Sequence, residues 1–232
     1  MYKRQVEDIY RPYKPKRKTR ASMAKARGLE PLALRIGEQR TGDDPRLLAA
    51  DFVKDEVPDV DAALAGARDI LAENISDAAE IRAALRNFYT ATARVASKAA
   101  KKDEDSVYAG YYDYSEPASK MAGHRVLAVD RGEREGFLKV SVEVESDRAL
   151  DLVLRRTVKN QSLCGQQVRE AAADAYARLI HPSLEREVRA GLTEKACEGA
   201  IRVFSKNLEQ LLLQPPIKGK VAMGLDLSLI HI

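Results

Sequence analysis

The spacing of apolar residues is the feature that most constrains the fold, because it follows the period of an α-helix along most of the chain. Between residues 59 and 75, apolar side chains recur every three or four positions, as they do on one buried face of a helix. The chain has no Trp and only four Phe, so its core must come from Leu, Val, Ile and Ala, which favours helices packed closely on helices. The helices expected from this spacing cover residues 22–29, 59–75, 77–102, 103–112, 147–158 and 165–180, followed by a short helix that Ser183 begins and a longer one that Thr193 begins.

In one stretch before residue 220, the spacing of apolar residues changes from the helical period to the period of a strand. In FLKVSVEVE, the apolar residues from Leu138 to Val144 alternate with polar ones, as on the two faces of a strand. Near the end of the chain, KGKVAMGLD reads as the start of a buried strand over residues 217–226. The sequence therefore predicts a mainly α fold with one short β element near 137–144 and a further strand that begins at the C-terminal end.

Positive charge is concentrated at the start of the chain. The first 28 residues carry ten Lys or Arg against two acidic residues, so the rest of a chain with net charge +4 is acidic. Within this region Pro12 and Pro15 favour an extended path, and Tyr10 and Tyr13 interleave with the basic residues. Such a segment could neutralise phosphates and stack on bases, or it could pair with the acidic surface of the same chain. The residues predicted to contact nucleic acid are Lys14, Lys16, Arg17, Lys18 and Arg20.

Motifs for catalysis are missing from the sequence, which holds no GxxxxGK phosphate loop and no GxSxG nucleophile motif. Cys164, Cys197 and the three histidines lack the spacing of a metal site, so we expect free thiols and no metal or other cofactor. No apolar run approaches the ~20 residues that a membrane span needs. These observations favour a non-enzymatic, cytoplasmic protein without a membrane partner.

A tyrosine cluster is predicted to pack against the core rather than to stack on bases: Tyr108, Tyr111, Tyr112 and Tyr114.

Several long blocks resemble the Tex family of bacterial transcription accessory proteins. They are VEDIYRPYKPKRKTRASMAKARGLEPLA, YYDYSEP, GHRVLAVDRGEREGFLKVSVEV, HPSLEREVRAGLTEKA and LEQLLLQPPIKGKVAMGLD, in that order. The resemblance covers residues 4–226 and implies a helical N-terminal region followed by a YqgF/RNase H-like domain, helix-hairpin-helix repeats and an OB-fold RNA-binding domain. By this resemblance, residues 1–214 are the later part of the helical region, incomplete at its start, and 217–226 are the first strand of a truncated RNase H-like domain. Residues 227–232, LSLIHI, read as an adaptor-derived tail.

The resemblance implies a helical scaffold portion of an RNA-binding transcription accessory protein, which binds RNA or DNA mainly through domains that follow this chain. One alternative is a fragment of an RNase H-like nuclease, in which Asp226 would be the first-strand carboxylate that helps to hold a divalent metal. Further acidic residues at RNase H-like positions downstream would favour that alternative. Another is a protein-binding helical module that docks on the transcription machinery, for which the acidic remainder of the chain gives some support.

Overall fold

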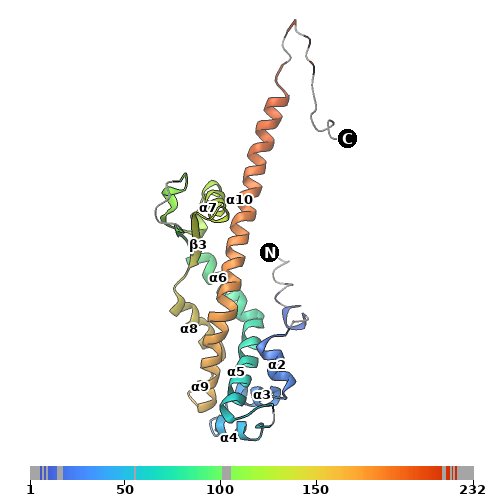
Figure 1. Ribbon diagram of the computed structural model, residues 1–232, viewed down its shortest axis with the longest axis vertical. Helices are drawn as coiled ribbons and strands as arrows, with labels where there is room; N and C mark the ends of the chain where they lie inside the picture. Colours follow the sequence, from blue (N-terminus) through green and yellow to red (C-terminus); the bar gives the residue numbers. More distant parts are fainter. Residues whose placement is uncertain are drawn as a thin grey trace.

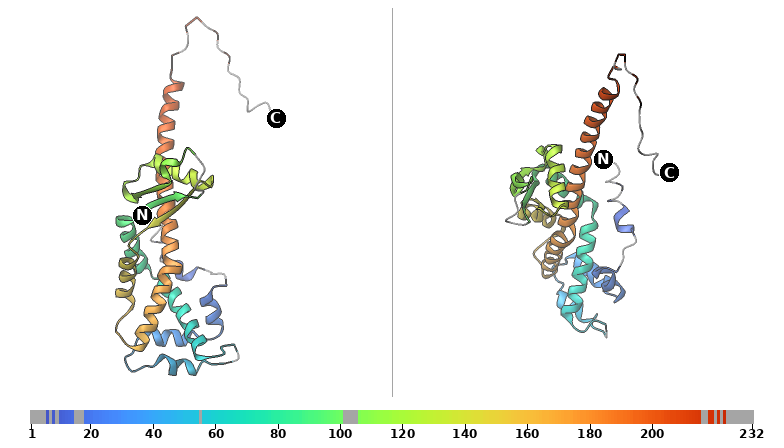
Figure 2. Two further views of the ribbon diagram at one scale, coloured as in Figure 1. Left: turned by 60° about the vertical axis from the view of Figure 1, so that its left-hand side comes forward. Right: turned by 45° about the horizontal axis from the view of Figure 1, so that its top comes forward.

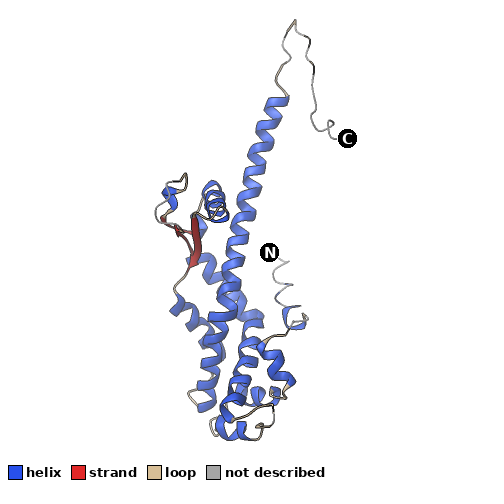
Figure 3. Ribbon diagram, viewed as in Figure 1, coloured by secondary structure: helices blue, strands red, loops and turns tan. Residues whose placement is uncertain are grey.

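Helices dominate the computed structural model, which confirms the mainly α prediction (Figures 1 and 3). The structure describes residues 6, 8, 10–14, 18–54, 56–100, 106–215, 218, 219, 221 and 223. Its helical elements are η1 (Arg11–Tyr13), α2 (Arg20–Ala26), α3 (Glu30–Glu38), α4 (Pro45–Ala50), α5 (Val60–Asp77), α6 (Ala79–Thr92), η2 (Ala109–Tyr111), η3 (Ala118–Lys120), α7 (Gly123–Arg134), α8 (Ser146–Thr157), α9 (Leu163–Asp174), η4 (Ala175–Ile180) and α10 (His181–Leu212). Its strands are β1 (Arg94–Ala99), β2 (Asp113–Pro117) and β3 (Leu138–Glu143).

The helical body is built around α5, which packs against α2, α3, α4 and α9 (Figure 1). The predicted apolar face of this helix is buried, and Ala63, Ala67 and Ile70 are almost inaccessible to solvent. As expected, Asp59 caps the helix by accepting a hydrogen bond from the backbone N–H of Ala62 at 2.7 Å. The small residues of α5 allow neighbouring helices to approach closely, as the Ala-rich composition predicts.

The second unit is a three-stranded antiparallel sheet in the order β2-β1-β3, which lies with α7 on one side of α10 (Figure 2). Strand β3 alternates between buried and exposed residues, which confirms the strand predicted near 137–144. The number of strands was predicted wrongly, because residues 94–99 were expected to continue a helix and DYSEP was expected to be only a turn. Helix α6 ends at Thr92, and Ala93 turns the chain into an extended path. The pairing of β1 with two strands distant in sequence outweighs the local helical preference of its Ala- and Lys-containing sequence.

The C-terminal helices are longer than the sequence predicts. A boundary was expected at His181-Pro182-Ser183, but helical structure continues from Leu163 to Leu212 through the π-helical turn η4. Pro182 has no N–H to donate to the preceding turn, and the wider π-helical turn η4 comes directly before it. Thr193 does not begin a new helix, since its hydroxyl donates to Asp130 of α7 at 2.6 Å.

Two further boundaries differ from the prediction. Helix α6 begins after Ala78 without a side-chain cap, whereas Ser76 or Asp77 was expected to cap it. The helix expected over 103–112 is reduced, among the residues described, to the single 3-10 turn η2. At the start of α6, the Asp77 carboxylate accepts a hydrogen bond from Arg11 in the N-terminal region, and no side chain caps the helix.

The cysteine prediction is confirmed, and the tyrosine prediction is confirmed for three of its four residues. The fourth, Tyr114, is half-buried, packs edge-to-face on Tyr111 and donates a hydrogen bond to Glu116. Tyr108 is buried and donates to Glu135 at 2.8 Å, and Tyr111 and Tyr112 pack against the core. Both thiols are free; Cys164 is buried and Cys197 is exposed.

Two remaining expectations concern the membrane and the C-terminal end. Within the described ranges, none of the helices combines the length and apolar character that a membrane crossing requires. Most of residues 217–226 and all of 227–232 lie outside the described residues, so the C-terminal strand and the tail stay predictions.

Two helical glycines give a matched test of the packing. A Cβ on Gly165 in α9 would overlap the backbone carbonyl oxygen of Asn160, which cannot move without breaking the loop before the helix. We expect Gly165→Ala to lower the free energy of unfolding by about 1–3 kcal/mol in urea denaturation. Gly199 in α10 faces open space, so Gly199→Ala should raise it by about 0.5–1 kcal/mol. Equal effects of the two substitutions would contradict this packing.

Candidate nucleic-acid interface

The basic N-terminal segment is fixed to the helical body at both ends. Its first end is the 3-10 turn η1, where Arg11 Nε donates to Asp77 Oδ1 at 3.1 Å, at the end of α5. The extended path predicted for residues 11–20 is therefore wrong for the first three residues, which form this turn. Lys14 then leaves the turn in an extended conformation.

Next to this turn, a buried cluster of charges ties the N-terminal region to α6 and α10. Asp8 is 6% exposed and accepts hydrogen bonds from Arg82 Nε at 3.3 Å and from Arg86 Nη1 at 2.8 Å. Arg82 also donates to the Ser183 hydroxyl of α10 at 3.0 Å, and Arg86 Nε donates to Glu187 Oε1 at 2.5 Å. We call Asp8, Arg82, Arg86, Ser183 and Glu187 the anchor cluster.

The anchor cluster has opposite effects on its two arginines. Burial, together with the nearby Arg11, lowers the pKa of Arg82, whose side chain is 2% exposed. Burial alone would also lower the pKa of Arg86, but its hydrogen bonds with Asp8 and Glu187 raise that pKa overall. A buried guanidinium is stable only while carboxylates and hydroxyls satisfy it, so Asp8 has a structural role in holding both arginines.

The second end of the segment is the start of α2. Thr19 and Ser22 form a reciprocal capping box, in which each side chain accepts a hydrogen bond from the other residue's backbone N–H, at 3.0 and 2.8 Å. The next turns bury Ala21 and Ala24, and Ala24 faces Gly66 of α5. The capping box therefore fixes the direction in which the chain enters the helical body.

At η1 and towards α2, the segment presents aromatic rings and cations to solvent. Tyr10 is 55% exposed and Tyr13 is 78% exposed. Of the residues predicted to contact nucleic acid, Lys14, Lys18 and Arg20 are exposed, whereas Lys16 and Arg17 lie outside the described residues. Exposed tyrosines beside lysines can stack on bases and neutralise phosphates.

Some basic residues of this segment interact with acidic residues of the same chain. Arg11 is held by Asp77. The hydrogen bond from Arg178 is the main cause that lowers the pKa of Asp174, and the positive charge of Arg20 adds to it. Lys14 and Lys18, in contrast, have exposed side chains. The segment thus combines residues that bind it to the body with residues that remain accessible to a ligand.

Sequence reasoning missed the anchor cluster. A signal was present, because Arg82 and Arg86 lie one turn apart beside the apolar residues Leu85 and Tyr89 of the same helix. Arginines so close to a buried face need polar partners. The sequence does not show that Arg82 finds them in Asp8 and Ser183, which lie 74 and 101 positions away.

Comparisons with known proteins agree on one family. Residues 40–204 match the family model described as Tex central region-like. The chain is 45% identical to the protein YdcI of Bacillus subtilis over 96% of its length, and 34% identical to the transcriptional accessory protein Tex of Neisseria gonorrhoeae over 95%. It is 28% identical to the human S1 RNA-binding domain-containing protein 1 over 96%. The chain spans 32%, 30% and 24% of the lengths of these three relatives, respectively.

The anchor cluster leads to a prediction about stability. Asp8→Asn removes the negative charge that two buried guanidinium groups require, so the free energy of unfolding should fall by about 2–4 kcal/mol in urea denaturation. Asp61→Asn is the matched control, because Asp61 pairs with Arg46 and both side chains are more than 70% exposed. The control should lose less than about 1 kcal/mol. A loss for Asp8→Asn no greater than that of the control would show that the cluster does not hold the N-terminal segment.

Proposed function

Because this chain belongs to the Tex family, we propose that it is a non-enzymatic helical scaffold portion of a transcription accessory protein that binds RNA. In this proposal its own contribution to binding is a phosphate-contacting surface formed by Lys14, Lys16, Arg17, Lys18 and Arg20. The protein acts in the cytoplasm, where the free thiols of Cys164 and Cys197 fit a reducing environment.

The observation that carries this proposal is the joint exposure of Tyr13, Lys14 and Lys18 on a segment held at both ends. A segment that is fixed at both ends loses less conformational entropy on binding than a free terminus does. The names of two relatives support the ligand class, since one is called a transcriptional accessory protein and another an S1 RNA-binding domain-containing protein.

Binding by this surface should be weak, indifferent to base sequence and steeply dependent on salt. Each phosphate neutralised on a single strand adds roughly 0.7 to the slope of log affinity against log salt concentration, so three to five contacts give a slope of about −2 to −4. Fluorescence polarisation with labelled single-stranded RNA and DNA of the same length, titrated at several salt concentrations, measures this slope. A slope near zero, or a strong preference for one base sequence, would contradict phosphate contact.

A charge-neutralising variant locates the contact on the chain. Lys16, Arg17 and Lys18 changed together to Gln should reduce RNA affinity about tenfold at low salt and flatten the salt slope by about two units, with an unchanged melting temperature. The matched control changes Arg155, Arg156 and Lys159 to Gln, which removes the same charge from exposed positions at the end of α8. Equal loss of affinity in both variants would indicate a general charge effect. Lowered stability with unchanged affinity would assign the segment to intramolecular pairing.

A further inference from the structure

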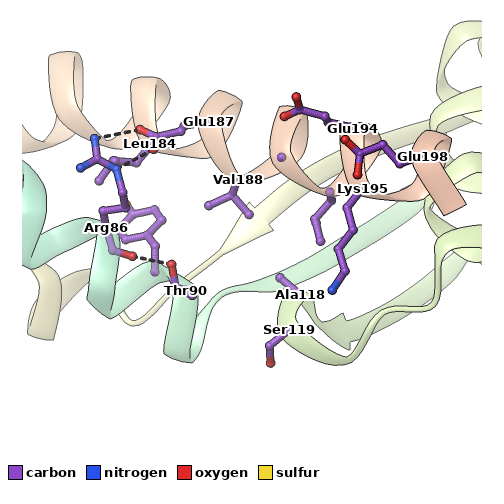
Figure 4. Close-up of a pocket in the computed structure, with 13 residues that line it drawn as sticks. Arg86, Thr90, Ala118, Ser119, Leu184, Glu187, Val188, Glu194, Lys195 and Glu198 are labelled. Atoms are coloured by element: carbon purple, nitrogen blue, oxygen red, sulfur yellow. Dashed lines mark hydrogen bonds and ion pairs between the residues drawn. The ribbon is translucent and has the colours of Figure 1, made fainter. Parts of the chain in front are cut away.

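A cavity of about 360 Å³ lies where α6, η3 and α10 meet (Figure 4). Its wall on α10 is formed by Leu184, Val188 and Leu192, which follow one another at helical spacing, and Tyr89 and Ala118 contribute from α6 and η3. Leu184 and Tyr89 are buried, whereas Val188 and Leu192 are half-buried. The cavity is therefore an apolar hollow that is large enough for one or two aliphatic side chains.

The charges at the edge of the cavity are of two kinds. At one end, Arg86 and Glu187 bind each other within the anchor cluster, so their charges are already compensated (Figure 4). At the other end stand Glu194, Lys195 and Glu198, whose side chains form no ion pair or hydrogen bond with another described residue. Two carboxylates against one ammonium group leave this edge acidic.

From this arrangement we propose that the cavity binds an amphipathic helix of a protein partner, whose apolar residues enter the hollow and whose Lys or Arg residues face Glu194 and Glu198. The two carboxylates are one helical turn apart on α10, which matches basic residues one turn apart on an apposed helix. Binding of an apolar helix face in a groove is a common mode of peptide recognition, in which the apolar anchors supply affinity and the flanking charges supply specificity.

The acidic edge also separates this surface from the nucleic-acid interface. Phosphates would be repelled by Glu194 and Glu198, whereas the basic segment around Lys14 attracts them. Arg86 belongs to both regions, because it lines the cavity and also holds Asp8. The cavity therefore adjoins the anchor cluster, and its acidic edge favours a basic protein segment over a nucleic acid.

The probe for this proposal is a fluorescein-labelled helical peptide of about 14 residues, long enough to cross the cavity, made of Leu at three- and four-residue spacing and Lys elsewhere. A second peptide replaces each Lys by Glu. We expect saturable binding of the lysine peptide in fluorescence polarisation at physiological salt, and at least tenfold weaker binding of the glutamate peptide. Equal affinity for both peptides would overturn the proposal.

Variants of the full chain locate the binding. Ser119→Trp places a large ring at the exposed edge of the cavity and should reduce lysine-peptide affinity about tenfold without changing the melting temperature. Glu194→Lys with Glu198→Lys should weaken the lysine peptide about tenfold and strengthen the glutamate peptide. The matched control, Asp51→Lys with Glu56→Lys, makes the same charge change at exposed positions between α4 and α5 and should leave both affinities within about twofold.

Two results would overturn the proposal. In one, the control variant weakens the lysine peptide as much as the variant at the edge of the cavity, which would mean nonspecific attraction to an acidic surface. In the other, sedimentation shows a dimer of the chain that Ser119→Trp dissociates, which would make a second copy the occupant of the cavity.

Discussion

The buried pairing of Arg82 with Asp8 is the interaction on which the rest of the arrangement depends. It brings the N-terminal region, α6 and α10 to one point, because the same carboxylate binds Arg86 and the same guanidinium binds Ser183. Taking these charges out of water is costly, and only their mutual hydrogen bonds offset that cost. The geometry is therefore tightly specified, and it fixes where the basic segment leaves the helical body.

Much of the fold follows from the sequence, but the parts made by distant contacts do not. The apolar spacing in α5, the cap at Asp59 and the alternation in β3 are local signals, and each was read correctly. Strand β1 was misread because its burial depends on pairing with residues up to 49 positions away, as between Arg94 and Glu143. For the candidate interface, the basic residues are visible in the sequence, whereas Asp8 and its two arginines become a cluster only after folding.

The long helix α10 connects the anchor cluster to the apolar cavity. Near its start it completes the anchor cluster through Ser183 and Glu187, and further along it carries the acidic edge of the apolar cavity. Arg189 joins it to α7 through Asp130 and Glu133, which holds the sheet unit beside the cavity.

The most direct test of the account asks where RNA lies on the chain. RNA that contains 4-thiouridine can be crosslinked to the protein by ultraviolet light and the modified peptides mapped by mass spectrometry. The account predicts crosslinks at Tyr10 and Tyr13, the exposed rings of the segment that the anchor cluster holds. Crosslinks confined to α7, α8 or the distal part of α10, with none between residues 10 and 20, would contradict it.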